Sequence, residues 1–210
     1  MADRVFGALL FLPVPAVLWL FTRTPIGAAG SLVLGVALMV THRLYARPFA
    51  LRRAARRCLW CGGGASGGPG FDVAEPIGSG PWRACTGGHR ERLDRVLGWA
   101  DRRTWLLRAG ILGTLALYLP AMLFAGTGRL GPVTGADAAA LFKLGVSLTV
   151  LPLGWLAPWR GVPRPGGASS PFPVHVQALI GTWATLWLFR LVGLVWLVQA
   201  AWHLGARILR

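Results

Sequence analysis

Two short motifs contain all three cysteines of this chain and one of its four histidines. They read C-L-W-C-G and C-T-G-G-H, and 23 residues lie between the second and third cysteines. Thiolates and an imidazole at this spacing are the usual ligands of tetrahedral zinc. The pattern therefore predicts that one zinc ion is bound by Cys58, Cys61, Cys85 and His89.

The predicted metal is structural, because four protein ligands leave no open position for water or a substrate. The nearby acids, Glu75 and Glu91, lie in no catalytic motif. The ion would fold a loop that has too few apolar residues to fold by itself. An iron–sulfur cluster, free thiols and a redox disulfide between Cys58 and Cys61 are the alternatives. Attachment of c-type haem is excluded, because no histidine follows the second cysteine.

A CxxCG turn, a loop and a C-x3-H sequence at a helix start resemble the treble-clef and zinc-ribbon families of small zinc sites. The resemblance covers residues 58–89 and implies a zinc ion held by the four ligands named above. The Gly-, Pro- and Ser-rich stretch 62–81 departs from the usual hairpin of these families and is typical of a loop or short hairpin. From His89 onward we expect a helix whose apolar stripe is Leu93, Val96, Leu97 and Ala100.

The composition of the whole chain is that of a membrane protein. Hydrophobic residues make up 54% of the 210 residues and charged residues only 14%, whereas a soluble domain has about 25% charged residues. Twenty-two basic and seven acidic residues give a formal net charge of +15. The eleven tryptophans suit a membrane–water boundary, where both the ring and its N–H are satisfied.

Five apolar runs are long enough to be spanning helices, and they cover residues 5–21, 26–45, 104–125, 138–158 and 174–206. The first run is expected to be a retained helix and not a cleaved signal peptide. The last run is longer than the bilayer requires, so it either tilts or has a first part along the interface. We predict an all-α, multi-pass membrane protein with about five spans and a small cytoplasmic zinc-binding loop.

The chain divides into five segments on this interpretation. Residues 1–46 form a transmembrane hairpin, 47–103 an Arg-rich zinc-binding segment, and 104–159 the third and fourth spans. A Pro/Gly-rich loop, 160–173, leads to the final helix, 174–210. Because basic loops stay in the cytoplasm, the metal loop is expected on the cytoplasmic side of a bacterial cytoplasmic membrane.

Basic residues are the other candidates for contacts with lipid or a partner. Arg190 stands inside the last apolar run, where a charge is costly. It either contacts an acid, a lipid phosphate or a pigment group, or extends to the interface. Arginines before the metal motif are candidates for contact with anionic lipid headgroups or another subunit, while nucleic acid is disfavoured. They are Arg52, Arg53, Arg56 and Arg57.

Three histidines near helix ends, His42, His175 and His203, are candidate ligands for haem or a pigment. No carboxylate is expected inside a span, which argues against an ion-coupled transporter. No phosphate-binding loop or hydrolase motif supports an enzyme. We therefore expect an accessory or structural subunit of a larger membrane protein complex, with the zinc loop as a docking module. The alternatives are a cofactor- or pigment-binding subunit of an electron-transfer or photosynthetic complex, and a small membrane enzyme or transporter for lipid-like substrates.

Overall fold

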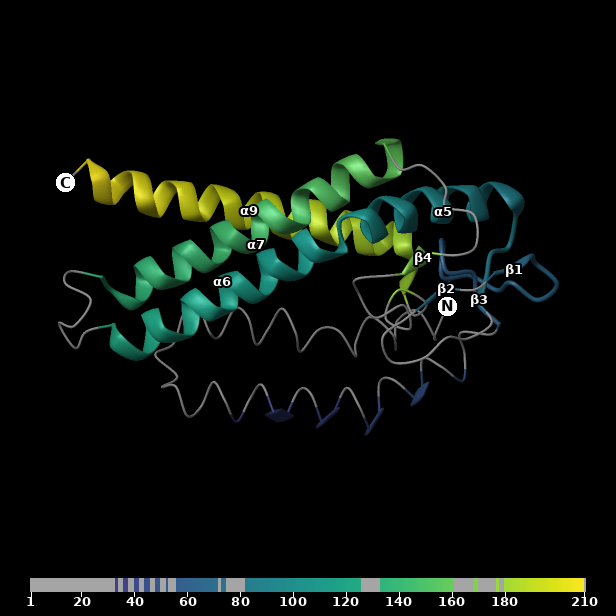
Figure 1. Ribbon diagram of the computed structural model, residues 1–210, viewed down its shortest axis with the longest axis horizontal. Helices are drawn as coiled ribbons and strands as arrows, with labels where there is room; N and C mark the ends of the chain where they lie inside the picture. The colour runs from purple at the N-terminus through teal and green to yellow at the C-terminus, as the bar shows by residue number, and fades with distance from the viewer. Residues whose placement is uncertain are drawn as a thin grey trace.

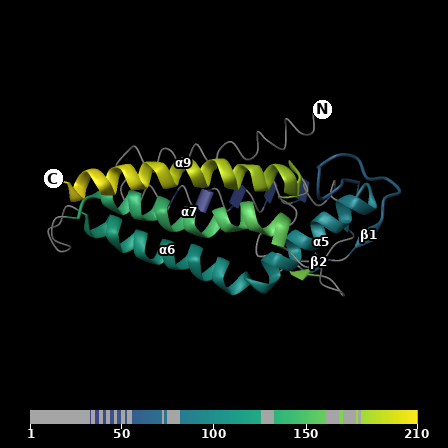
Figure 2. The ribbon, with the colours of Figure 1, turned by 90° about the horizontal axis from the view of Figure 1, so that it is seen from above.

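Three long helices lie side by side and carry a small folded module at one end (Figure 1). The computed structural model describes residues 56–71, 82–125, 133–160 and 181–209, with isolated positions before and between these ranges. The long helices are α6 (Thr104–Phe124), α7 (Gly135–Arg160) and α9 (Thr182–Ile208). Helix α7 lies between α6 and α9 and packs on both (Figure 2).

All three long helices are long and apolar enough to cross a membrane. They correspond to the last three predicted spans. The other two, 5–21 and 26–45, lie outside the described residues except for isolated positions in the second. The predicted count of about five is therefore not supported, since the described part of the chain contains three such helices.

The shorter helix α5 (Gly87–Arg102) begins two residues before the predicted start at His89. Its N-cap is Thr86, whose Oγ1 accepts a hydrogen bond from the backbone N–H of His89 at 3.2 Å. This bond satisfies one of the amides that a helix start leaves without a partner, which compensates for the two glycines in the first turn. The buried face consists of the predicted stripe together with Gly98 and Trp99.

The Gly-rich stretch contains short strands in its described part. Strand β1 (Gly70–Phe71) pairs antiparallel with β3 (Trp82–Arg83), as a short hairpin would. Strand β2 (Val73–Ala74) pairs parallel with β4 (Ala168–Ser169), which brings a segment that follows α7 to the same end of the molecule. We call the described residues 56–74 and 82–102 the metal module.

The metal module and the long helices share one hydrophobic core. Side chains of the module belong to the same buried cluster as side chains of α6, α7 and α9. The module is therefore part of the helical body and not a domain on a linker. The shared core includes Leu59, Trp82, Leu93, Leu97, Leu107, Leu153, Ala157 and Leu186.

Helices α6 and α7 are joined by the same G-x3-T motif on each, Gly110–Thr114 and Gly145–Thr149. Each threonine Oγ1 donates to the glycine carbonyl four residues earlier on its own helix, at 2.6 Å for Thr114 and 2.8 Å for Thr149. Each threonine also lies against the glycine of the other helix, where a Cβ would clash with it. Small residues at both crossing points let the two backbones approach closely, as is common between membrane helices.

Helices α7 and α9 are joined by an ionic cluster at the end away from the module. Asp137 is buried, and its Oδ1 lies 3.0 Å from His203 Nε2 and 3.1 Å from Arg207 Nε. Its Oδ2 accepts hydrogen bonds from the N–H and the Oγ1 of Thr134, both at 2.8 Å. The expectation that no span contains a carboxylate is wrong, because α7 begins at Gly135 and not at residue 138. These contacts give the carboxylate a structural role.

The Gly–Thr contact can be tested by adding one methyl group. We expect Gly145→Ala to lower the free energy of unfolding by about 1–3 kcal/mol. The side chain of Thr114 cannot rotate away, because its Cβ and both of its branches lie within 3.4 Å of the new methyl. Thermal unfolding of the purified protein in one detergent measures the effect. Gly113→Ala is the control, since a Cβ there meets nothing within 4 Å, and equal stability of the two variants would contradict the packing role.

Candidate metal centre

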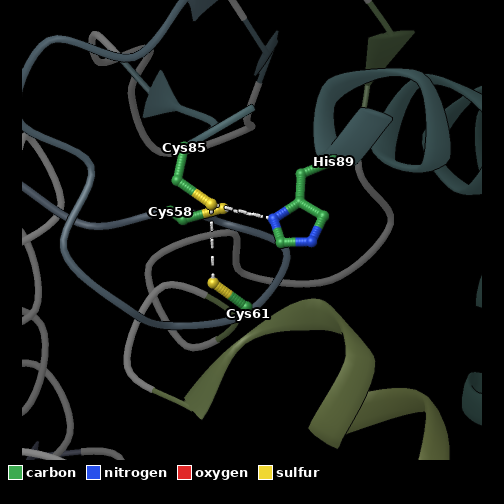
Figure 3. A group of neighbouring side chains, drawn as sticks. All are labelled: Cys58, Cys61, Cys85 and His89. Carbon is green, nitrogen blue, oxygen red and sulfur yellow. Dashed lines mark hydrogen bonds between the residues drawn. The ribbon is translucent and has the colours of Figure 1, made fainter. Parts of the chain in front are cut away.

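The four predicted ligands converge at the module end of the molecule (Figure 3). Cys58 and Cys61 lie in the first turn of the module, Cys85 precedes the N-cap of α5, and His89 lies in the first turn of α5. Their ligand atoms all lie within 4.8 Å of one another. The group could therefore hold a metal ion.

Two of the distances between ligand atoms match the edges of a tetrahedral zinc site. Zinc bonds of about 2.3 Å to sulfur and 2.0–2.1 Å to nitrogen give tetrahedron edges of about 3.8 Å between sulfurs and 3.6 Å between sulfur and nitrogen. Cys61 Sγ lies 3.9 Å from Cys85 Sγ, and Cys58 Sγ lies 3.6 Å from His89 Nδ1. The third edge, between Cys85 Sγ and His89 Nδ1, is shorter at 2.9 Å. The donor set and two of these three edges suit zinc.

Residues 58–63 form a tight turn that we call the knuckle. The N–H of Gly62 donates to the carbonyl of Cys58 at 2.8 Å, and the N–H of Gly63 points at Cys61 Sγ at 3.4 Å. Gly62 has a φ of 68°, in the left-handed region that glycine adopts without strain. The glycine after the second cysteine thus lets the backbone fold back so that the next N–H points at sulfur.

The surroundings of the thiols favour ionisation of Cys58 but oppose ionisation of Cys85 next to it. Burial disfavours ionisation of Cys58, but N–H donors from Cys61, Cys85 and Trp60 outweigh it and hold the Cys58 pKa below its ordinary value. At Cys85, burial and the adjacent Cys58 and Cys61 sulfurs raise the pKa to about 11. A bound divalent cation would offset this repulsion, and loading would release protons.

The knuckle caps the N-terminus of α9 through the backbone. The N–H of Thr182 donates to the carbonyl of Leu59 at 2.8 Å, and the N–H of Trp183 donates to the carbonyl of Trp60 at 3.0 Å. Thr182 Oγ1 donates to the Leu59 carbonyl as well, at 2.8 Å. The first amides of a helix have no partner within it, so the knuckle supplies acceptors that α9 requires. Figure 3 shows this helix end next to Cys61.

Two glycines permit this close approach. Gly181 has a φ of 91°, and a Cβ there would lie 2.7 Å from the Trp60 carbonyl oxygen and 2.9 Å from the Gly62 nitrogen. A Cβ on Gly62 would lie 3.1 Å from the backbone of Ile180. Sequence analysis missed this contact. The available signal was a Gly-Thr pair inside an apolar run, but the partner lies about 120 residues away.

Helix ends also favour the negative charge of the site. Three thiolates and one divalent ion carry a net charge of about −1. The partially positive N-termini of α5 and α9 both lie next to the ligands. Two helices oriented toward the ligands would therefore stabilise a site loaded with a divalent ion.

The other predicted site residues do not join this centre. His203 lies at the opposite end with Asp137, and Arg190 contacts α7. Arg52 and Arg56 are exposed, and Arg57 Nη1 donates to the Gly62 carbonyl at 3.4 Å. Three further candidates lie outside the described residues, namely His42, His175 and Arg53.

Fold and site together define a mostly helical chain with three helices able to cross a membrane and a Cys3His group able to hold a metal ion. Comparison with known proteins gives no match to a family model, a curated protein or a solved structure. The resemblance to treble-clef and zinc-ribbon sites therefore rests on the ligand pattern alone.

Removal of one ligand should remove the metal. We expect about one equivalent of zinc in the purified protein and a small fraction of that in Cys85→Ser and in His89→Gln, because three ligands leave the tetrahedron incomplete. Elemental analysis by mass spectrometry measures the content and also distinguishes zinc from iron. His203→Gln is the matched control and should keep its metal. Full occupancy in both ligand variants would show that this cluster does not bind the ion.

The contact between knuckle and α9 predicts that Gly181→Ala weakens metal retention. The added methyl forces the knuckle away from the helix, and its positive φ adds strain of about 1–3 kcal/mol. We expect zinc to pass to a coloured chelator about tenfold faster than from the parent protein. Gly205→Ala changes the same helix where no atom lies within 4 Å and should leave the rate unchanged. Identical rates for the two variants would mean that the helix does not support the metal centre.

Proposed function

We propose that this chain is an accessory subunit of a larger membrane complex. Helices α6, α7 and α9 embed it in the bilayer, and the zinc-stabilised module docks a partner subunit. One observation carries the proposal, namely that the module is fixed to the bundle by a shared core and by backbone hydrogen bonds to α9. A surface held in one orientation loses little conformational freedom on binding, which favours stable docking.

Charge supports a cytoplasmic position for the module. Basic segments next to spanning helices stay on the cytoplasmic side. The described residues of the module and the adjoining Arg103 include only three acids, Glu91, Asp94 and Asp101. The arginines are Arg56, Arg57, Arg83, Arg90, Arg92, Arg95, Arg102 and Arg103. We propose a bacterial cytoplasmic membrane as the location.

Charge also indicates the chemistry of the partner. On α5, Glu91 pairs with Arg95 at 2.9 Å and Asp94 with Arg90 at 3.7 Å. Arg92 is exposed on the same helix, and the described residues offer it no ion-pair partner. Once the two ion pairs within α5 are set aside, Arg92 leaves this helix with an exposed positive charge. Such a surface suits an acidic surface on another subunit.

A structural role for the zinc follows from its four protein ligands. Glu91, two residues after the ligand His89, is paired with Arg95 and so is not free to act as a general base at the ion. The haem- or pigment-binding alternative has less support at His203, because its Nε2 faces Asp137 at 3.0 Å. We therefore retain the accessory subunit as the proposal.

Co-purification tests the proposal. The full chain is extracted from its native membranes in mild detergent, and proteins present in fixed stoichiometry are identified by mass spectrometry. We expect a defined partner that is lost from Arg92→Glu, because the reversed charge repels an acidic surface. Arg160→Glu makes the same change at the exposed end of α7, outside the module, and should retain the partner. A chain that purifies alone and monomeric would contradict the proposed function.

A further inference from the structure

A proline in α7 creates the first part of an unassigned site. Pro158 has no N–H, so the carbonyl of Gly154, four residues earlier, lacks its helical partner. Arg190 of α9 supplies the donor, with its Nε 2.9 Å from the Gly154 oxygen. Gly154 also lets the arginine lie against α7, since a Cβ there would be 3.1 Å from Arg190 Cγ. The arginine is thus held by the backbone of the neighbouring helix.

Two tryptophans hold the guanidinium group in a fixed orientation. Arg190 Cζ lies 4.7 Å from the ring centroid of Trp155 and 4.8 Å from that of Trp187. These distances are typical of cation–π contacts. The rings are 45% and 40% exposed, so the arrangement opens to the outside of the bundle.

Most donors of this guanidinium are still available. Nε serves Gly154, and the two terminal nitrogens carry four further N–H groups in one plane. Within the described ranges no carboxylate pairs with Arg190. Asp94 and Glu91 bond arginines of α5, Asp101 belongs to the last turn of α5, and Asp137 lies at the other end of the bundle. A charge on a membrane helix is costly without a counter-charge, so the site calls for an anion.

The depth of Arg190 suits a lipid headgroup. Arg190 lies eight residues after Thr182, or about 12 Å along α9 from the module end. The helix is about 40 Å long, so it extends about 5 Å beyond each side of a 30 Å hydrocarbon core. An arginine side chain can bridge the remaining distance to the phosphate layer. Exposed tryptophans near this end of the three helices mark the same boundary, namely Trp105, Trp159 and Trp183.

We propose that Arg190, held between Trp155 and Trp187, binds the phosphodiester of an anionic membrane lipid. The planar fork of arginine can donate two parallel hydrogen bonds to phosphate. An exposed apolar stripe continues along the same face of α9 at helical spacing and accommodates an acyl chain; it consists of Trp187, Leu191, Leu194 and Val198. This inference rests on the proposal that the helices span a membrane, but not on any partner subunit.

Native mass spectrometry of the full chain in detergent tests the site, with phosphatidylglycerol and phosphatidylcholine as probes. We expect one phosphatidylglycerol to be retained, and phosphatidylcholine to bind more weakly. Arg190→Gln should lower the affinity for phosphatidylglycerol about tenfold, while its amide can still donate to the Gly154 carbonyl. Arg160→Gln removes an exposed arginine at the same end and should leave the affinity unchanged. Equal binding by Arg190→Gln and the parent protein would overturn the proposal.

Further variants keep the test decisive if Arg190→Gln does not fold. Trp187→Leu retains the charge but removes one wall, and Arg190→Lys retains the charge without the planar fork. Both should also bind less phosphatidylglycerol, and full binding by both would overturn the site. Inorganic phosphate is the second probe, and its displacement of phosphatidylglycerol at equal concentration would assign the site to free phosphate instead. A chain that binds the lipid but has no partner subunit would leave this site intact and contradict only the proposed function.

Discussion

The capping of α9 by the knuckle is the contact on which the rest of the structure depends. Two carbonyls, of Leu59 and Trp60, accept from the first amides of a helix that begins about 120 residues later. Such amides cannot be left unpaired at the edge of an apolar layer without a large cost. The knuckle contains two of the four candidate ligands, so a metal held there would constrain the same turn that caps α9. Module and bundle should therefore unfold together.

Several polar groups deeper in the bundle also meet a partner that satisfies them. Arg190 bonds the carbonyl that Pro158 leaves free, and the hydroxyls of Thr114 and Thr149 bond carbonyls of their own helices. Asp137 bonds the amide of Thr134 as well as two basic side chains of α9. These contacts hold α7 between its neighbours where apolar side chains alone would allow sliding.

Local patterns in the sequence predicted which four Cys and His residues come together and where the three long helices lie. Both signals can be read within one segment, namely the spacing of the ligands and the length of an apolar run. Helix starts were less accurate, since a cap such as Thr86 or the early start of α7 at Gly135 depends on one or two bonds. The knuckle–α9 contact could not be predicted, because it joins residues far apart in the chain. The bond between Arg190 and the Gly154 carbonyl had one local signal, because Pro158 leaves that carbonyl without a helical donor. The sequence did not indicate which helix would supply the donor.

The position of the capping carbonyls has a consequence for the order of assembly. Synthesis begins at the N-terminus, at roughly 5–20 residues per second. All four ligands are therefore complete several seconds before the ribosome reaches Thr182. The acceptors for the last helix can be in place before that helix is synthesised, so α9 can form next to carbonyls that are already positioned. If the Cys3His group holds a metal ion, timely delivery of that ion would be a condition for correct placement of the C-terminal helix.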